Sequence, residues 1–194
     1  TSGQGGALAV RSQDLGNRDR VLRRDGVINQ PDGKRRMIAL GNKFDSTDFQ
    51  SALLINQLSH IQKNHKRRKK VYKRYTDSFQ DSGIQTISTV PDSIHSYHLF
   101  VILVNPLFRD QMREALSSAG ISTSVHYEAI HLEPYYREQF QFDESICPNS
   151  VEFGKSVISL PTYPKLSTRK QKYVVSTILI LNKKFNANLN IDDN

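Results

Sequence analysis

A long amphipathic segment between Ser46 and Phe79 constrains the fold of this chain more than any other feature. Ser46 or Thr47 is suited to cap the start of a helix, and Asp48 in the first turn complements the helix dipole. Apolar residues then recur three or four positions apart, or at multiples of that spacing, which is typical of a helix with one buried face. They are Leu54, Leu58, Ile61, Tyr72, Tyr75 and Phe79. We therefore predict one long helix over residues 47–80, which connects two packed bodies and is least buried through its basic middle.

Strand and helix patterns alternate after the long helix, between residues 81 and 185. In order, they predict a strand over 96–104, a helix over 109–119, a strand over 121–127, a loop or short helix from Pro134, a helix over 149–158 and a last helix capped by Ser167. This order indicates an α/β fold with α+β character. A small mixed or antiparallel sheet would be covered by helices on one side.

The first 46 residues are too few to form a domain of their own. Their pattern predicts a short strand over 7–10, a helix over 14–24 and a loop over 26–41 with a turn at Pro31-Asp32-Gly33. We expect residues 1–46 to be the remnant of a larger domain. At the other end, the polar residues 186–194 predict a disordered tail.

Composition excludes two classes of protein. One cysteine among 194 residues cannot form an internal disulfide, which excludes a disulfide-stapled secreted scaffold. No apolar run approaches the ~20 residues of a membrane-spanning helix. The start at Thr1 lacks the features of a secretory signal, so we expect a cytoplasmic protein with no membrane partner. Because the first methionine is Met37, we also expect a processed product or a segment whose start is missing.

The formal net charge of +8 is concentrated in the long helix, where eight basic residues lie between Lys63 and Arg74. Such a cluster suits either a solvated helix face or a polyanion such as nucleic acid. Tyr72 and Tyr75 lie on the apolar stripe of the same helix, so they are badly placed to stack on bases. This placement favours the solvated face.

Two stretches carry groups that attract anions, and each has a plain structural alternative. Glycines within Thr1–Gly6 allow backbone amides to approach a phosphate, or they form an ordinary turn. In Gly41–Asp48, Lys43 precedes a predicted helix N-terminus, where unpaired amides and a lysine are both positive. The alternative is a charged loop before an ordinary capped helix.

A histidine-containing stretch follows the second predicted strand of the small domain. His126, Tyr127 and His131 suit contact with a substrate, because residues at strand ends often face clefts, but packed and hydrogen-bonded histidines are an equal alternative. A zinc site needs three or four convergent ligands, so we expect no metal here. Cys147 is the only thiol and has no paired base in the sequence, so we assign it no role.

Five stretches resemble, in the same order, motifs of the DegT/DnrJ/StrS family of sugar aminotransferases. They are Gly3–Val10 (T-x-G-E-G-G and a strand), Gly41–Leu58 (G-x-N-x-R-x-T-D-x-Q-A-A and a helix), Tyr97–Ile102 (Y-H-L-F/Y), Gly120–Tyr136 (G-I-x-T-x-x-H-Y…H…P-x-Y) and Ser159–Pro164 (S-L-P-x-Y/F-P). The resemblance spans roughly residues 1–180. Each motif is weak alone, but five in the right order are specific.

The resemblance implies a fold and an activity. Family members belong to fold type I of the enzymes that depend on pyridoxal 5'-phosphate, and residues 81–185 correspond to their small C-terminal domain. They act as homodimers and typically transfer an amino group from glutamate to the keto carbon of a nucleotide-linked sugar. The pathways implied are those that make surface polysaccharide or lipopolysaccharide sugars.

The resemblance also implies roles for particular residues. Lys43, with Asn42 beside it, corresponds to the position that reaches across the dimer to the cofactor phosphate. His126, Tyr127 and His131 correspond to residues near the mouth of the substrate cleft.

Three positions depart from the family pattern, and one catalytic group is absent. Gln4 stands where glutamate is usual, Lys43 where asparagine is most common, and Asp45 where arginine or asparagine is frequent. The lysine that forms the Schiff base with the cofactor would lie just before Thr1. We therefore expect the chain to be inactive alone, as the C-terminal portion of an aminotransferase. The alternatives are a non-catalytic remnant or regulatory relative, and a basic nucleic-acid-binding module.

Overall fold

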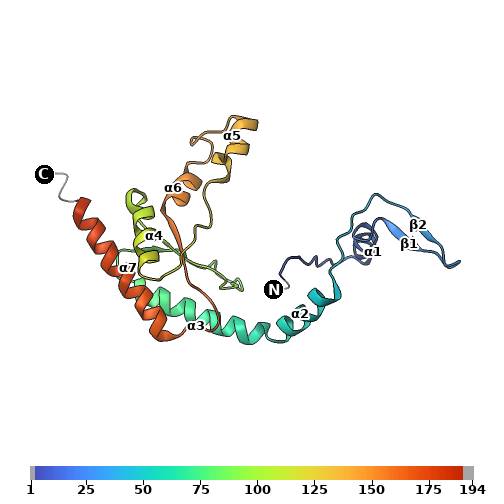
Figure 1. Ribbon diagram of the computed structural model, residues 1–194, viewed down its shortest axis with the longest axis horizontal. Helices are drawn as coiled ribbons and strands as arrows, with labels where there is room; N and C mark the ends of the chain where they lie inside the picture. The colour runs from blue at the N-terminus through green and yellow to red at the C-terminus, as the bar shows by residue number, and fades with distance from the viewer. Residues whose placement is uncertain (1–2, 190–194) are drawn as a thin grey trace. The chain divides into compact units, whose positions relative to one another are not determined.

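The computed structural model describes residues 3–189 and divides into two compact units, residues 1–61 and 62–194 (Figure 1). The first unit contains α1 (Gln13–Leu22), β1 (Val27–Asn29), β2 (Arg35–Met37) and α2 (Asp48–Ser59). Apart from the first residue of α3, the second unit contains α3 (Ile61–Phe79), β3 (Gln85–Thr86), β4 (Phe100–Leu103), a 3-10 turn (Pro106–Phe108), α4 (Arg109–Ser118), a second 3-10 turn (Ile130–Leu132), α5 (Pro134–Phe140), α6 (Pro148–Ser156), β5 (Val157–Leu160) and α7 (Thr168–Leu189).

A short antiparallel hairpin, β1–β2, lies where the sequence predicts only a loop. Val27 pairs with Met37, and Asn29 with Arg35. The predicted turn closes the hairpin, because the Gly33 N–H donates to the Gln30 carbonyl at 2.9 Å while Gly33 holds a positive φ of 79°. The strands are only three residues long and mostly exposed, so they leave no apolar alternation in the sequence.

Two further expectations for the first unit have opposite outcomes. The helix predicted over 14–24 is confirmed as α1, whose N-cap Ser12 accepts a hydrogen bond from the Leu15 N–H. The strand predicted over 7–10 is wrong. These residues are exposed and pair with no other strand among residues 3–189.

Two helices, α2 and α3, replace the single helix predicted over 47–80. The predicted start is correct, with Thr47 and Gln50 forming a reciprocal capping box. The interruption falls at His60, whose Nδ1 lies 2.9 Å from the Asn56 carbonyl oxygen, while Ser59 Oγ donates to the same oxygen at 2.8 Å. In a continuous helix this carbonyl would accept the His60 N–H. Local side-chain hydrogen bonds have displaced that backbone bond, which ends α2.

The second unit is built on a three-stranded antiparallel sheet in the order β3-β4-β5. The antiparallel form is one of the two predicted, and β4 confirms the strand around 96–104 in shorter form. The sequence places Val157 and Ile158 at the end of a helix, but α6 ends at Ser156 and both residues lie in β5. Their β-branched side chains suit a strand, and all four residues of β5 are buried.

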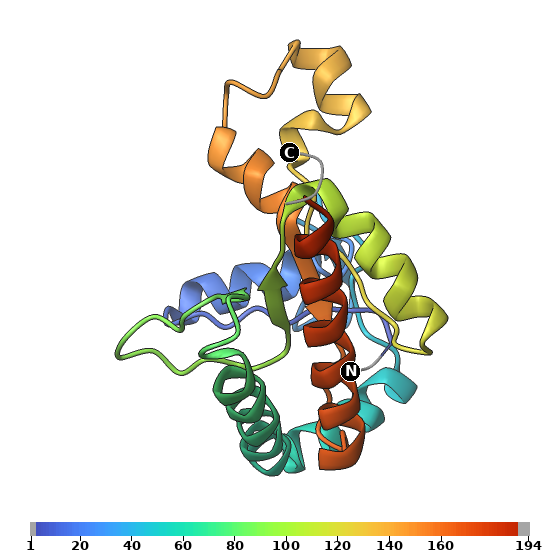
Figure 2. The same ribbon diagram turned by 90° about the vertical axis from the view of Figure 1, so that its left-hand side faces the viewer.

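Helices α3, α4 and α7 cover one face of this sheet, as the sequence predicts. Figure 2 shows α7 in red running beside α4. Phe100 and Ile102 of β4 point into the same core as Ile158 and Leu160 of β5. The helices add Tyr75, Phe79, Met112, Leu116, Val174 and Ile178 to that core.

Aromatic rings fill the centre of the core around Phe100. The Phe100 ring lies 4.8 Å from the Tyr72 ring and 4.8 Å from the Tyr75 ring, and Phe79 stacks nearby at 6.2 Å. Tyr75 is fully buried, and its hydroxyl donates to the Pro161 carbonyl at 3.1 Å. Burial raises the pKa of the Tyr75 phenol, because the charged form would be poorly solvated there.

Two remaining expectations for the second unit need correction. The strand predicted over 121–127 is reduced to one bridge between Ser124 and Ser159. The tail predicted over 186–194 is helical as far as Leu189, because α7 continues without a helix breaker and Phe185 stacks on Phe108 at 5.2 Å. Residues 190–194 lie outside the described residues.

We predict that Phe100→Ala lowers the free energy of unfolding of the second unit by about 3–5 kcal/mol, because it leaves a cavity at the centre of the core. Ile94, which is 93% exposed in the same unit, provides the control. Ile94→Ala should change stability by no more than about 0.5 kcal/mol. Urea unfolding followed by circular dichroism measures both, and equal effects of the two substitutions would show that the core is placed wrongly.

Candidate functional site

Residues 41–44 of the first unit run along the end of α1, which fixes the backbone on both sides of Lys43. The Asn42 N–H donates to the Leu22 carbonyl at 2.8 Å, and the Phe44 N–H donates to the Arg23 carbonyl at 2.9 Å. Lys43 itself forms an antiparallel bridge with Arg24. The position from which the Lys43 side chain projects is therefore set by main-chain bonds.

Two glycines make this close approach possible. A Cβ added at Gly41 would overlap the Gly26 nitrogen and the Leu22 carbonyl oxygen, and one at Gly26 would overlap the Ala39 carbonyl. Gly26 also holds a positive φ of 71°, which costs glycine little. Both glycines are therefore needed for the backbone that carries Asn42 and Lys43.

Asp45 has a structural partner that explains why an acidic residue is suitable at this position. Its carboxylate lies 3.1 Å from Arg24 Nε and 3.6 Å from Arg23 Nε. Both arginines directly follow α1, so the two ion pairs join the segment after Lys43 to the C-terminal end of that helix. An arginine at position 45 would face two arginines here.

A hollow of about 450 Å³ lies between the glycine-rich start and the beginning of α2. Gly3–Ala7 line one side, and residues 44–46 with Gln50 and Leu54 line the other. Gln50 Nε2 donates to the Gln4 carbonyl at 3.1 Å, which holds the two sides together. Thr1 and Ser2 of the glycine-rich motif lie outside the described residues.

The Lys43 side chain fits the role of a phosphate ligand. It is exposed, and within residues 3–189 no carboxylate lies within ion-pair distance of its ammonium group. Asn42 and Lys43 do not line the glycine hollow but precede residues that do. An exposed lysine on a fixed backbone retains its three N–H donors for an anionic group.

The second group of predicted residues lies behind the sheet, in the second unit. Ser159 alternates with Ile158 and Leu160 along β5, so its side chain lies on the face away from the helix-covered core. There Ser159 Oγ lies 2.8 Å from His126 Nδ1. The Ser159 N–H also donates to the Ser124 carbonyl at 2.7 Å. His126 is thus held against the sheet.

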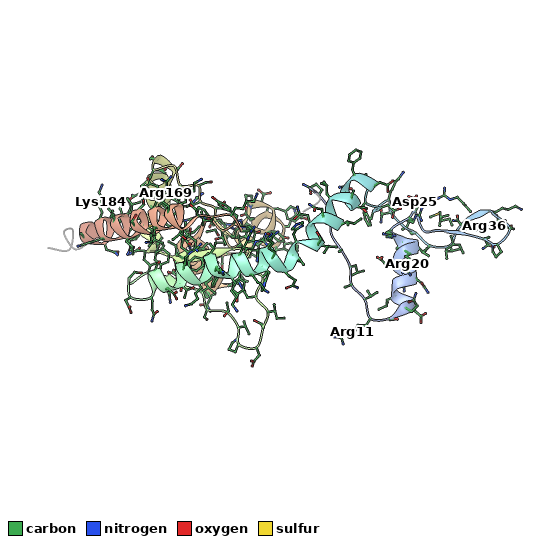
Figure 3. The ribbon with its side chains drawn as sticks, turned by 90° about the horizontal axis from the view of Figure 1, so that it is seen from below. Arg11, Arg20, Asp25, Arg36, Arg169 and Lys184 are labelled. Carbon is green, nitrogen blue, oxygen red and sulfur yellow. The ribbon has the colours of Figure 1, made fainter. Side chains whose placement is uncertain are left out.

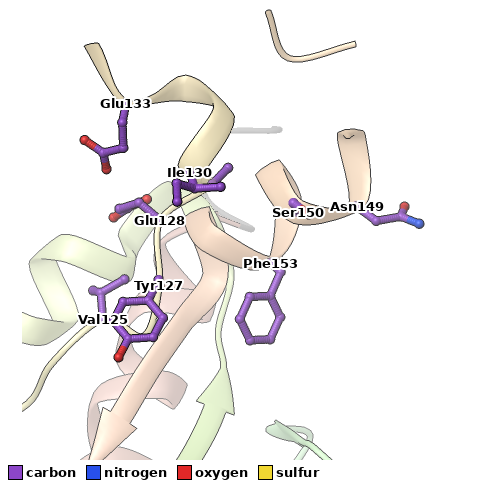
Figure 4. A pocket seen from close by; sticks show the side chains of 9 residues that line it. Val125, Tyr127, Glu128, Ile130, Glu133, Asn149, Ser150 and Phe153 are labelled. Carbon is purple, nitrogen blue, oxygen red and sulfur yellow. The ribbon is translucent and has the colours of Figure 1, made fainter. Parts of the chain in front are cut away.

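Tyr127 opens onto a cavity of about 730 Å³ between the 125–133 segment and α6. Figure 4 shows the Tyr127 and Phe153 rings on two sides of this cavity, with Glu128 and Glu133 beside it. Tyr127 is 73% exposed, and its ring meets the His126 ring edge-on at 4.9 Å. The cavity combines aromatic walls with carboxylates and the Asn149 amide, groups that can bind a polar ring such as a sugar.

Arg109 anchors the wall of this cavity through Glu128. Its guanidinium is almost fully buried and donates to Glu128 Oε1 at 2.9 Å, while Asp110 lies 3.2 Å from its Nε. On the other side, Gly154 of α6 approaches the 127–129 backbone so closely that an added Cβ would lie 3.0 Å from the Ala129 nitrogen. The segment is therefore fixed by an ion pair and by backbone packing.

His131 lies apart from the cavity. Its side chain is buried, with an exposed fraction of 7%. Its Nε2 has no hydrogen-bond partner among the described residues. The structure therefore places Tyr127 on the cavity and His126 against the Tyr127 ring without lining the cavity, and it directs His131 into the protein. A substrate role for these three residues stays a prediction.

Asp143, in the loop after α5, is the carboxyl group near His131 with a shifted pKa. The Ser145 hydroxyl and then the Ser145 N–H donate to it at 2.5 and 2.8 Å, and these bonds lower its pKa. Coulombic interaction with His131 and with Arg137 lowers the pKa of Asp143 further. Asp143 is therefore charged over the whole physiological pH range.

Residues 3–189 contain neither a cluster of metal ligands nor a membrane-spanning helix. No group of three His, Cys, Asp or Glu side chains there is arranged to hold a metal ion. No helix in that part of the chain is long and apolar enough to cross a bilayer.

Comparison with protein families gives one family across almost the whole chain. The model of the DegT/DnrJ/EryC1/StrS aminotransferase family matches residues 1–179. The chain belongs to this family.

Two curated relatives of this family member come from a bacterium and an archaeon. The spore coat polysaccharide biosynthesis protein SpsC of Bacillus subtilis is 32% identical over 180 residues, which are 86% of this chain and 46% of SpsC. MJ1066 of Methanocaldococcus jannaschii is 30% identical over 181 residues, 86% of this chain and 47% of that protein. The chain thus spans about half the length of the curated relatives that it matches.

Solved structures of other aminotransferases share the fold of this chain. PseC of Helicobacter pylori, an aminotransferase involved in the biosynthesis of pseudoaminic acid, aligns with a TM-score of 0.87 at 22% identity, over 95% of this chain and 50% of PseC. The putative sugar aminotransferase Spr1654 of Streptococcus pneumoniae aligns with a TM-score of 0.85 at 23% identity, over 97% of this chain and 48% of Spr1654. Spr1654 has also been solved in a PMP form and a PLP form.

Sequence reasoning assigned no role to several residues that line the Tyr127 cavity or hold its neighbours in place. Ser159 carried a signal, because it is a polar residue within the apolar run Val157–Leu160. Arg109 and Glu128 carried no such signal in the sequence, because their ion pair joins two residues that are 19 positions apart. Asn149 and Phe153 enter the cavity only because α6 returns over the 125–133 segment.

We predict that Ser145→Ala raises the pKa of the Asp143 carboxyl toward its ordinary value, because the hydroxyl bond is the largest cause of its lowering. A carboxyl whose pKa is lowered in the folded state stabilises the protein above its unfolded pKa, and this contribution is lost as pH falls through the folded pKa. Titration of the Asp143 signal by nuclear magnetic resonance tests the shift. An unchanged midpoint in Ser145→Ala would contradict the assigned cause.

Proposed function

We propose that the chain is the C-terminal portion of a pyridoxal phosphate-dependent sugar aminotransferase. It would transfer an amino group from glutamate to a keto sugar carried on a nucleotide, in the cytoplasm, as part of a homodimer. The proposed pathways are those of surface polysaccharides or lipopolysaccharides. The observation that carries this proposal is the family match over residues 1–179. The relative SpsC, a spore coat polysaccharide biosynthesis protein, supports a polysaccharide pathway.

Lys43 would bind the phosphate of the cofactor across the dimer. Its ammonium charge, exposed side chain and fixed backbone suit a phosphate, and Asn42 supplies the neighbouring amide. When bound, the cofactor supplies an electron sink for moving the amino group. The Schiff-base lysine is assigned to the part of the enzyme that this chain does not span.

The cavity at Tyr127 would hold the sugar. The exposed Tyr127 hydroxyl can bond a polar substrate, while Glu128 and Glu133 can accept hydrogen bonds from sugar hydroxyl groups. We assign His126, which Ser159 holds beside the Tyr127 ring, to contact with the same substrate. Arg109 would act as a positioning residue through Glu128. The role assigned to the chain's own groups is therefore binding and orientation.

The two alternative functions have less support. A non-catalytic remnant would keep the fold without needing an exposed, unpaired Lys43 or a polar cavity. A nucleic-acid-binding module would need aromatic rings that stack on bases, but Tyr75 is buried and Tyr72 packs on Phe100.

We predict activity when the missing portion is supplied. The 194-residue chain, fused behind the N-terminal half of Bacillus subtilis SpsC, should catalyse glutamate-dependent amination of at least one member of a panel of nucleotide-linked keto sugars. The chain alone should show none. Product formation is followed by mass spectrometry. A folded, cofactor-bound hybrid that aminates no member of the panel would favour the non-catalytic alternative.

Lys43→Gln in the same hybrid should weaken pyridoxal phosphate binding by about tenfold or more, because a charge-assisted hydrogen bond is lost. Lys34→Gln is the matched control, since Lys34 is an exposed lysine of the same unit at the hairpin turn. Equilibrium dialysis measures both dissociation constants. Equal affinity in the two variants would remove Lys43 from the cofactor site.

A further inference from the structure

A groove of about 340 Å³ between α3 and α7 carries groups that the proposed function does not use. Figure 3 shows the two helices side by side within the second unit. Its volume lies within the usual range of small-ligand pockets. Residues of α3 form one wall, and residues of α7 form the other wall and the floor.

Arg74 is a fixed cation on the α3 wall. Its Nε donates to Gln171 Oε1 at 2.6 Å, and its Nη2 lies 3.5 Å from the Leu166 carbonyl oxygen. Gln171 is itself 2% exposed and donates to the Val71 carbonyl at 2.7 Å. A guanidinium has five N–H groups, so these two bonds hold the side chain in place and leave others for a ligand.

The charged side chains that line the groove are Arg74, Lys172 and Asp77, so the lining carries one net positive charge. The two helices around it are strongly basic, with eight basic residues in α3 and five in α7 against the single acidic residue Asp77. Lys73, which lies outside the lining, forms an exposed ion pair with Asp77 at 2.9 Å. Lys172, exposed on α7, lines the groove opposite Arg74 and has no carboxylate within ion-pair distance in the described chain. The groove therefore complements an anion.

The rest of the lining suits a sugar better than a bare anion. The hydroxyls of Ser78 and Ser176 donate to the carbonyls of Arg74 and Tyr173, which leaves their oxygens free to accept hydrogen bonds from ligand hydroxyl groups. Val175 and Leu179 are half-buried and provide an apolar floor. Such a floor can pack against the C–H groups of a pyranose ring.

We propose that the α3–α7 groove is a second ligand site, which binds a sugar phosphate. The phosphate lies toward Arg74 and Lys172, the sugar hydroxyls donate to Ser78 and Ser176, and the ring rests on Val175 and Leu179. The site uses none of the residues assigned to the aminotransferase reaction. Binding of a sugar phosphate to it can therefore be measured in the absence of any enzymatic activity.

The test uses the full 194-residue chain and glucose 6-phosphate as the probe, with glucose and inorganic phosphate as separate arms. Binding is followed through the amide signals of residues 168–179 by nuclear magnetic resonance. We expect glucose 6-phosphate to bind more tightly than either of its parts. Lys172→Gln should weaken this binding by about tenfold, the effect of one charge-assisted hydrogen bond.

Lys170→Gln is the matched control, because Lys170 is exposed on the same helix but does not line the groove. It removes the same charge and should change the affinity by no more than about twofold, as expected for a screened surface charge. Ser176→Ala, which keeps both cations, should reduce the preference for glucose 6-phosphate over inorganic phosphate. The amide spectra also report whether each variant is folded.

Three results would overturn the proposal. They are the absence of a saturable shift with glucose 6-phosphate at millimolar concentration, equal weakening by Lys170→Gln and Lys172→Gln, and inorganic phosphate binding as tightly as glucose 6-phosphate. The second would show only a general positive potential, and the third would remove the sugar from the site.

Discussion

The antiparallel pairing of β4 with β5 is the constraint on which the second unit depends. Phe100 pairs with Leu160 and Ile102 with Ile158, so these four side chains share the face that α3, α4 and α7 cover. Because successive residues of a strand point to opposite faces, the same register turns Ser159 away from the core and toward His126. A shift of one residue would bury Ser159 among aromatic rings and release His126 from the sheet. Core and candidate site therefore depend on the same pairing.

Each candidate site is held by interactions of groups that need not touch a ligand. Gly26 and Gly41 allow the backbone at Lys43 to pass against α1, and Asp45 pairs with the arginines there. Arg109 fixes Glu128 in the same way at the Tyr127 cavity. In the α3–α7 groove, the buried Gln171 fixes Arg74. At Lys43 these contacts fix the backbone, and in the other two places a polar partner orders a side chain before any ligand is present, which lowers the entropic cost of binding.

The sequence predicts the elements whose signals are local and regular. The N-cap at Thr47, the apolar positions Tyr75 and Phe79 and the β-branched and aromatic residues of β4 each correspond to an observed element. Leu58 and Ile61, earlier in the same predicted stripe, are exposed. The break at His60 escapes such reasoning, since hydrogen bonds from Ser59 and His60 to one carbonyl leave no mark in the apolar pattern. A run of four buried residues such as β5 fits a buried helix end as well as a strand, and only its partner β4 decides between them.

Short motifs single out Asn42, Lys43, His126 and Tyr127 as candidate site residues, and their roles stay predictions. The burial of His131 and the Arg109–Glu128 ion pair follow from how distant segments pack, which no short motif indicates.

The glutamate half-reaction tests the central claim most directly. In the hybrid with the N-terminal half of SpsC, glutamate added without any sugar should change the visible absorption of the bound cofactor and release about one 2-oxoglutarate per bound cofactor. That result would show that this chain completes an aminotransferase site. A hybrid that binds pyridoxal phosphate but releases no 2-oxoglutarate would contradict the account.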